Sequence, residues 1–235
     1  MNLVSKGFDP SKINVYVQPP TLGADNTFKE YGFNLTELDA AHMVVWCGGQ
    51  DINPALYNEK PHVTVHWSPG RDAVEVKLFK LSEGKFRIGI CRGAQLLNVL
   101  SGGRLWQHVS GHGRAHEIRD EFTGRRLITS SVHHQMMRAA KDAVLVATSR
   151  GISQHKEAMD MTWRRPYGTE LPLLNSKEKS RLNHFDLDPE VLWYPKTRSL
   201  CFQGHPEFGP NECTEYFFEL IARYYGQKDI IKEAA

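Results

Sequence analysis

Residues 86–98 read FRIGICRGAQLLN, an apolar run that ends at Cys91 and continues as a helix-forming run. We expect a buried strand over 86–90 and a helix from Arg92. A side chain on so sharp a strand-to-helix turn projects away from both elements, and glycines at 89 and 93 let the two backbones pass closely. The amino end of a helix also favours negative charge, which stabilises a thiolate. Cys91 is therefore predicted to be a nucleophile.

A second motif that could take part in catalysis follows another short apolar strand, expected over 199–203. It reads GHPE at 204–207. A cysteine nucleophile needs a base to carry its proton and a third group to orient that base, and His205 and Glu207 supply both types. Taken singly, Cys91 fits a buried structural cysteine and the second motif fits a solvated turn. Because each motif follows a strand, we favour a catalytic triad.

Acyl transfer also needs donors for the negative charge that develops on the carbonyl oxygen. The amide of Arg92, directly after the nucleophile, is one candidate. The other is the Gly48-Gly49 pair, which follows an expected strand over 43–47. An ordinary turn is the alternative for these two glycines.

The composition is that of an ordinary soluble protein. The chain has 235 residues, 40% of them apolar, and a formal net charge of +2, so we expect one large core and no nucleic-acid partner. No apolar stretch approaches the roughly twenty residues of a membrane helix, and we see no secretory signal. We expect a cytoplasmic protein with free thiols rather than disulfides at its four cysteines, which are residues 47, 91, 201 and 213.

The hydrophobic pattern of the first half alternates strands with helices. We expect strands over 13–17 and 43–47 and helices over 27–35 and 72–82, which is a βαβ rhythm. The chain is expected to close with a strand over 191–194, the strand before His205 and an amphipathic helix over 212–225.

The middle of the chain has a different pattern beyond Gly103. Shorter apolar runs at 116–119, 126–130 and 143–148 favour an antiparallel excursion. Residues 150–189 are polar without a clear period, and we expect them to form a loop-rich insertion.

The motifs together resemble the class I glutamine amidotransferase superfamily. The Gly-x-Cys-x-Gly-x-Gln run over 89–95 and the later His-Pro-Glu carry this resemblance. Within the superfamily, the chain resembles the γ-glutamyl hydrolase branch that includes γ-glutamyl-γ-aminobutyrate hydrolase. The residues that carry this closer resemblance are Arg92 with Asn98, Gly102 with Gly103, the loop over 47–54 with Tyr57, and SVHHQ over 131–135.

The resemblance implies a flavodoxin-like α/β fold. This is a three-layer αβα sandwich with a mostly parallel central sheet and a small antiparallel excursion, in a single domain over 1–235. It also implies a triad of Cys91, His205 and Glu207. The oxyanion hole would comprise Gly48, Gly49 and Arg92.

For substrate binding, the resemblance implies contacts to the γ-glutamyl portion. The implied residues are Gln95, Ser131, Val132, His133 and Gln135. Adjacent histidines in an extended segment cannot both face one pocket, so we expect only one of His133 and His134 to line the site. Many glutamine-using relatives carry an aliphatic residue where this chain has Arg92. Its guanidinium therefore forms either an internal ion pair or a substrate contact.

Three histidines, at 108, 112 and 116, have the i, i+4 spacing of helical metal ligands. Ser110, Gly111 and Gly113 argue against a helix there, and no carboxylate or cysteine completes a persuasive ligand set. We expect no metal and no cofactor.

The sequence therefore predicts a cysteine hydrolase of γ-glutamyl amide bonds that acts on a small-molecule substrate. The first alternative is a glutaminase subunit that passes ammonia to a separate synthetase. The second is a non-catalytic binding protein on the same fold. A homodimer stays open, and the amine half of the substrate is expected to meet the 150–189 insertion and the loop after Tyr57.

Overall fold

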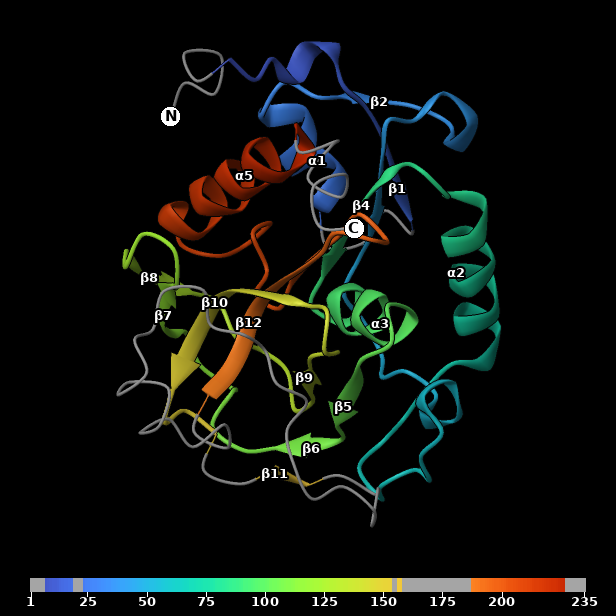
Figure 1. The fold of residues 1–235 in the computed structure, drawn as a ribbon, viewed down its shortest axis with the longest axis vertical. Coiled ribbons are helices and arrows are strands. Elements are labelled where there is room, and N and C mark those ends of the chain that lie inside the picture. Colours follow the sequence, from blue (N-terminus) through green and yellow to red (C-terminus); the bar gives the residue numbers. More distant parts are fainter. Residues whose placement is uncertain (1–6, 19–22, 154–155, 158–186, 227–235) are drawn as a thin grey trace.

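The fold is built on one large twisted sheet, shown in Figure 1. The computed structural model describes residues 7–18, 23–153, 156–157 and 187–226. Nine strands pair in the order β2-β1-β3-β4-β13-β12-β10-β7-β8.

One half of this sheet is parallel. Its strands are β1 (Asn14–Gln18), β2 (Asn34–Leu35), β3 (Met43–Trp46), β4 (Phe86–Ile90) and β13 (Ser199–Phe202). The antiparallel half comprises β12 (Leu187–Tyr194), β10 (Val144–Arg150), β7 (His116–Asp120) and β8 (Arg126–Thr129). Two small ladders pair β5 (Arg104–Trp106) with β9 (Met136–Arg138), and β6 (His108–Val109) with β11 (Lys156–Glu157).

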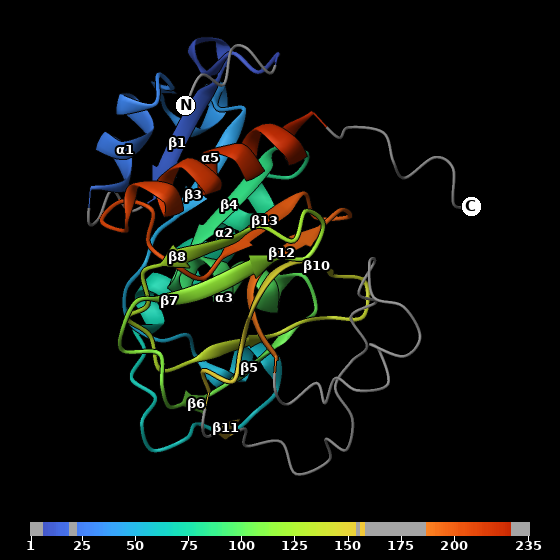
Figure 2. The same ribbon diagram turned by 90° about the vertical axis from the view of Figure 1, so that its left-hand side faces the viewer.

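Helices cover both faces of the sheet, as Figures 1 and 2 show. The α-helices are α1 (Ala24–Glu30), α2 (Pro69–Leu81), α3 (Arg92–Leu100) and α5 (Asn211–Tyr225), and short 3-10 turns span Pro10–Lys12, Leu38–Ala40 and Pro54–Tyr57. Side chains of α1 and α5 share one buried cluster with Val45, whereas those of α2 and α3 share the other with Val44. Because successive strand residues face opposite sides, β3 is buried on both faces. The predicted three-layer fold is confirmed.

Most predicted elements lie within one to three residues of the observed ones, but the helix expected over 27–35 is wrong. Helix α1 ends at Glu30, and the parallel strand β2 occupies Asn34–Leu35. Gly32 has a φ of 87°, and its N–H donates to the carbonyl of Lys29. A left-handed glycine of this kind terminates a helix, and the chain then returns to the sheet.

The predicted insertion over 150–189 needs a correction at its end. Strand β12 already begins at Leu187, and Pro189 pairs with Thr148 of β10. The hydrogen-bonded pairing between β12 and β13 begins only at Val191. Pro189, which has no backbone N–H, therefore lies outside this pairing and costs it no hydrogen bond. Residues 154–155 and 158–186 of the predicted insertion lie outside the described residues.

Two further predictions concern the whole chain. The described residues include all four cysteines, and these form no disulfide. Across the same described ranges, the longest helices are too short or too polar to cross a membrane.

The close crossing of β4 and α3 predicts a stability difference between two glycine substitutions. A Cβ at Gly89 would lie 2.5 Å from backbone atoms of Gly93 and Ala94, whereas a Cβ at Gly70 in α2 would meet nothing within 4 Å. Gly89→Ala should therefore lower the free energy of unfolding by about 1–3 kcal/mol or more. Gly70→Ala should raise it by about 0.4–1 kcal/mol. Urea unfolding followed by circular dichroism measures both, and equal stability of Gly89→Ala and the wild type would contradict the close crossing.

Candidate active site

Three neighbouring parallel strands end at the same edge of the sheet, and each is followed by residues that the sequence singled out. Strand β4 lies between β3 and β13, with Gly89 in register with both Trp46 and Cys201. The segments that follow these strands begin at Cys47, Cys91 and Gln203. Ligands of open α/β sheets bind at such carboxyl ends.

Cys91 occupies the predicted turn between β4 and α3. Its backbone has φ 51° and ψ −108°, which is a strained conformation for a residue with a Cβ. Its N–H donates to the carbonyl of Phe202 at 2.9 Å, and its carbonyl accepts the N–H of Gln95 at 3.1 Å. These two bonds hold the strained turn between β13 and the first turn of α3. The side chain remains slightly accessible, because the residue is 6% exposed.

His205 lies between Cys91 and Glu207. Its Nδ1 is 2.7 Å from Oε1 of Glu207, and its ring interacts electrostatically with the Cys91 side chain. Burial disfavours the imidazolium, but the interactions with Cys91 and Glu207 outweigh burial and raise the pKa of His205 to about 9. The ring of Phe208 stacks on the imidazole at 4.4 Å between centroids. The structure thus brings the three predicted residues together, with His205 in contact with both of the others.

The main chain of His205 is fixed by Ser130, a residue that the sequence did not single out. The hydroxyl of Ser130 accepts the His205 N–H at 2.7 Å and donates to the His205 carbonyl at 3.0 Å. Ser130 directly precedes the segment predicted to bind substrate. One serine therefore couples that segment to the imidazole.

The Gly48-Gly49 loop lies against the other side of His205. A Cβ at Gly48 would come within 2.7 Å of His205 Cε1, and Gly49 has a φ of 143°, where a Cβ is strained. Nη2 of Arg71, on α2, donates to the carbonyls of Cys47 at 3.0 Å and Gly48 at 2.9 Å. Gly48 is therefore required because a side chain there would collide with His205, and Gly49 is required because of its backbone conformation.

The side chain of Arg92 forms the internal ion pair, which was the first of the two alternatives. It is 1% exposed and binds the carboxylates of Asp72 and Glu75, both on α2. Oε1 of Glu75 also accepts Nε of Arg71 at 2.8 Å. An ion network thus connects the residue after Cys91 to the glycine loop.

The residues predicted to bind substrate lie near this edge, but most of their side chains face inward. Nε2 of Gln95 donates to the Gln135 carbonyl at 3.0 Å, and Nδ1 of His133 is 2.8 Å from the same oxygen. The hydroxyl of Ser131 donates to the carbonyl of His112 at 2.8 Å. These contacts fix the backbone of the segment.

The segment over 131–135 is buried at both ends and more exposed between them. Val132 is 58% exposed. His134 faces away from His133 and lies 3.0 Å from Oδ1 of Asp51. The two adjacent histidines therefore have different environments, as the alternation of an extended segment requires.

Two residues that hold the glycine loop escaped the sequence analysis. Arg71 and Glu75 are four residues apart on α2, which is the ordinary spacing of a surface ion pair on a helix. Their involvement depends on Arg92 and on the carbonyls after β3, which are remote in sequence. Only the folded arrangement identifies them.

The chain is similar to several known proteins over part of its length. A protein of Mycobacterium tuberculosis named "Putative glutamine amidotransferase Rv2859c" is 48% identical over 84 residues, which cover 32% of this chain and 27% of that protein. The carbamoyl phosphate synthase small chain of Neisseria meningitidis serogroup A is 27% identical over 164 residues, which cover 69% of this chain and 34% of that protein. The matches span about a quarter to a third of the length of these curated relatives.

The fold has counterparts among solved structures. A glutamine amidotransferase from Thermotoga maritima matches with a TM-score of 0.52 and 14% sequence identity, covering 92% of this chain and 85% of that one. At this identity the likeness concerns the fold. The family model of Peptidase C26 matches residues 24–162, more than half of the sequence, and this chain therefore belongs to the Peptidase C26 family.

Proposed function

We propose that this protein is a cysteine hydrolase that cleaves γ-glutamyl amide bonds. The observation that carries the proposal is the position of His205 at the carboxyl edge of the sheet, where it is hydrogen-bonded to Glu207 and interacts with Cys91. A thiol, an imidazole and an orienting carboxylate in this order are the parts of a nucleophilic acyl-transfer site. Membership of the Peptidase C26 family and the similarity in sequence to a protein named a putative glutamine amidotransferase support the same chemistry.

The first half of the proposed reaction forms a thioester. Sγ of Cys91 attacks the side-chain carbonyl carbon of the γ-glutamyl group. The proton of the thiol is by then on Nε2 of His205, because the imidazolium is the favoured form of this ring at neutral pH. Glu207 accepts the Nδ1–H and so fixes the tautomer that leaves Nε2 facing the thiol. When the tetrahedral intermediate collapses, the C–N bond breaks and the imidazolium protonates the leaving amine.

The second half releases glutamate. A water molecule gives a proton to His205 and attacks the thioester carbon. The C–S bond then breaks, the sulfur keeps the electron pair of that bond, and the imidazolium again faces it. The protein ends in its starting protonation state, and no cofactor enters either half.

Backbone N–H groups stabilise the oxyanion in both halves. The amide of Arg92 is at the first position of α3, where helix N–H groups lack intrahelical acceptors. Gly48 and Gly49 provide the second side of the hole, because their loop lies directly beside His205. Donors held in place before the reaction begins stabilise the developing charge without reorganisation.

We assign the γ-glutamyl portion of the substrate to Gln95 and the 131–135 segment. The side chain of Gln95 is bound to the Gln135 carbonyl, so it orders the segment rather than reaching far into solvent. Val132 is the exposed member of the segment. Backbone groups of 131–135 would meet the α-amino and α-carboxylate groups of the substrate.

A second candidate function is that of a glutaminase subunit which passes ammonia to a synthetase. Similarity to a carbamoyl phosphate synthase small chain over 69% of this chain favours it. The chemistry at Cys91 would be the same, with ammonia as the leaving group. The two functions differ in whether turnover needs another polypeptide. A non-catalytic binding protein would not need the buried thiol, imidazole and carboxylate in one chain.

Purified protein should release amine from γ-glutamyl amines without any partner, because all proposed catalytic groups come from this chain. Chromatographic detection of free amine and glutamate measures the reaction, with glutamine as a parallel substrate. Ammonia release from glutamine that appears only when a synthetase is added would favour the subunit function. No release from any γ-glutamyl amide under either condition would contradict both.

Cys91→Ala should abolish turnover and retain the fold, because it removes one buried sulfur and leaves the surrounding contacts in place. A glutamine-like electrophile should label Cys91 in the wild type, since Cys201 and Cys213 are fully buried. Burial also raises the pKa of the Cys201 thiol and that of Cys213, which disfavours their reactive thiolates. Peptide mass spectrometry locates the label. Labelling at Cys201 or Cys213, or an active Cys91→Ala protein, would reassign the nucleophile.

Arg71→Met should lower kcat by roughly 10-fold to 100-fold, less than removal of a direct oxyanion donor. The substitution removes the hydrogen bonds that hold the carbonyls of Cys47 and Gly48. Arg126→Met is the matched control, because the Arg126 side chain is 66% exposed in a surface ion pair. Steady-state kinetics with circular dichroism measures both variants. Wild-type kcat in folded Arg71→Met would show that this arginine does not position the loop.

A further inference from the structure

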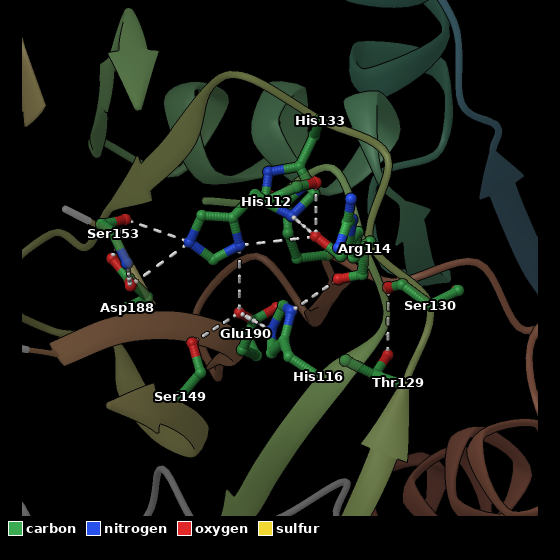
Figure 3. A network of polar contacts seen from close by, with 12 residues as sticks. His112, Arg114, His116, Thr129, Ser130, His133, Ser149, Ser153, Asp188 and Glu190 are labelled. Carbon is green, nitrogen blue, oxygen red and sulfur yellow. Dashed lines mark hydrogen bonds and ion pairs between the residues drawn. The ribbon is translucent and has the colours of Figure 1, made fainter. Parts of the chain in front are cut away.

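Three buried side chains that the proposed mechanism does not use meet beside the antiparallel half of the sheet, as Figure 3 shows. His112 lies between β6 and β7, His116 begins β7, and Glu190 is on β12. One nitrogen of each imidazole and one carboxylate oxygen all lie within 4.8 Å of one another. In sequence, the serine and glycines among these histidines argue against a helix, and no nearby carboxylate or cysteine completes a persuasive ligand set. Glu190, far along the chain, supplies one.

The hydrogen bonds of His112 determine which of its nitrogens faces this cluster. Nε2 lies 3.3 Å from Oδ2 of Asp188 and 3.0 Å from the hydroxyl of Ser153. Asp188 also accepts the hydroxyl of Ser153 at 2.8 Å and lies 2.7 Å from Nζ of Lys156, so this carboxylate acts as an acceptor. Nε2 therefore carries the ring proton in neutral His112. Its Nδ1 presents a lone pair, 3.8 Å from Oε1 of Glu190.

His116 is oriented in the same way by a different acceptor. Its Nδ1 lies 3.3 Å from the carbonyl oxygen of Arg114, which can only accept a hydrogen bond. Its Nε2 lies 2.8 Å from Oε1 of Glu190. In the neutral ring, this second lone pair also points at the carboxylate. Both imidazoles thus have the outer hydrogen bond that orients histidine ligands of metals.

Glu190 supplies the third ligand atom of the cluster, a carboxylate oxygen. It is 1% exposed, and its Oε1 accepts the hydroxyl of Ser149 at 2.8 Å. Its Oε2 is buried and has no hydrogen-bond partner within the described part of the chain. A buried, unpartnered carboxylate oxygen beside two imidazole lone pairs is unfavourable unless a cation joins them.

Two cations satisfy this arrangement to different degrees. A proton on His116 satisfies one contact, between its Nε2 and Oε1 of Glu190. It leaves Oε2 of Glu190 without a partner within the described residues, and Nδ1 of His112 with only the Ser131 hydroxyl, 3.4 Å away. A metal ion contacts both imidazoles and the carboxylate together. The donor set of two neutral imidazoles and one carboxylate matches zinc, whereas Mg²⁺ and Ca²⁺ prefer oxygen ligands.

We propose that His112, His116 and Glu190 bind one divalent transition-metal ion of the zinc type. Zinc–ligand distances are about 2.0–2.2 Å, so closure around the ion needs only small side-chain movements from the observed spacing. Asp188 and the Arg114 carbonyl orient the two imidazoles from outside. A fourth ligand position remains for water.

The site adjoins the structure that supports His205. The carbonyl of His112 accepts the hydroxyl of Ser131, and the neighbouring Ser130 holds the backbone of His205. A metal ion at His112 therefore stabilises the junction between β7, β12 and the 130–135 segment. Its role is structural, and it takes no part in proton transfer or acyl transfer.

Equilibrium dialysis of chelator-treated full-length protein against Zn²⁺ tests the proposal. The variants are made in the Cys91→Ala protein, because the Cys91 thiol and the His205 imidazole together could also bind zinc. We expect one Zn²⁺ per chain in the wild type and in Cys91→Ala. Adding His116→Gln should remove this stoichiometric binding. His66→Gln, at an exposed histidine, is the matched control and should retain it.

Asp188→Asn tests the role of a residue that orients the His112 imidazole without binding the metal ion. It keeps all three ligands and should weaken Zn²⁺ binding about 10-fold to 100-fold rather than abolish it. Absence of stoichiometric Zn²⁺ in folded Cys91→Ala, or equal binding after His116→Gln, would overturn the proposal.

A second measurement uses Co²⁺ and leaves His112, His116 and Glu190 unchanged. It therefore does not depend on ligand variants, which can fail to fold. In Cys91→Ala, bound Co²⁺ should show visible bands of a nitrogen and oxygen environment without sulfur charge-transfer absorption. A featureless spectrum identical to that of aqueous Co²⁺ would also contradict the site. Circular dichroism establishes that each protein is folded during these measurements.

Discussion

The parallel pairing of β4 with β13 is the constraint on which the site depends. It brings the ends of two strands that are remote in sequence to one edge of the sheet, where Cys91 and His205 meet. The hydrogen bond from the Cys91 N–H to the Phe202 carbonyl continues this pairing into the turn. Strand β3, on the other side of β4, places the glycine loop against the imidazole. Sheet register therefore determines the geometry of the proposed reaction.

The surroundings of the site explain how a strained turn persists. Gly89 permits the backbone of α3 to cross β4 closely, and the ion network of Arg71, Glu75 and Arg92 fills the space beneath the loop. Charged groups in this buried position are tolerated because each has an opposite charge and directional hydrogen bonds. The same network restricts the loop that we assign to the oxyanion hole, so packing and proposed catalysis use the same residues.

The sequence was most informative where chemistry depends on local geometry. The strand, turn and helix around Cys91 follow from an apolar run and two glycines, and the loop at His205 follows from its flanking glycine and proline. The helix error at 27–35 arose because a helical pattern was extended through Gly32, whose left-handed conformation ends the helix. Contacts such as Arg92 with Asp72, or His116 with Glu190, depend on remote segments. No local pattern indicates which charged residues will meet.

The proposed reaction depends on direct interaction between the Cys91 thiol and an imidazole that Glu207 orients. Nuclear magnetic resonance titration of the His205 ring in the wild type and in Cys91→Ala measures it most directly. Burial favours the neutral ring, whereas the interactions with Cys91 and Glu207 favour the imidazolium and raise the pKa of His205 to about 9. Removing the sulfur should therefore make His205 lose its proton at a lower pH than in the wild type. The same titration midpoint in both proteins would contradict the central interaction.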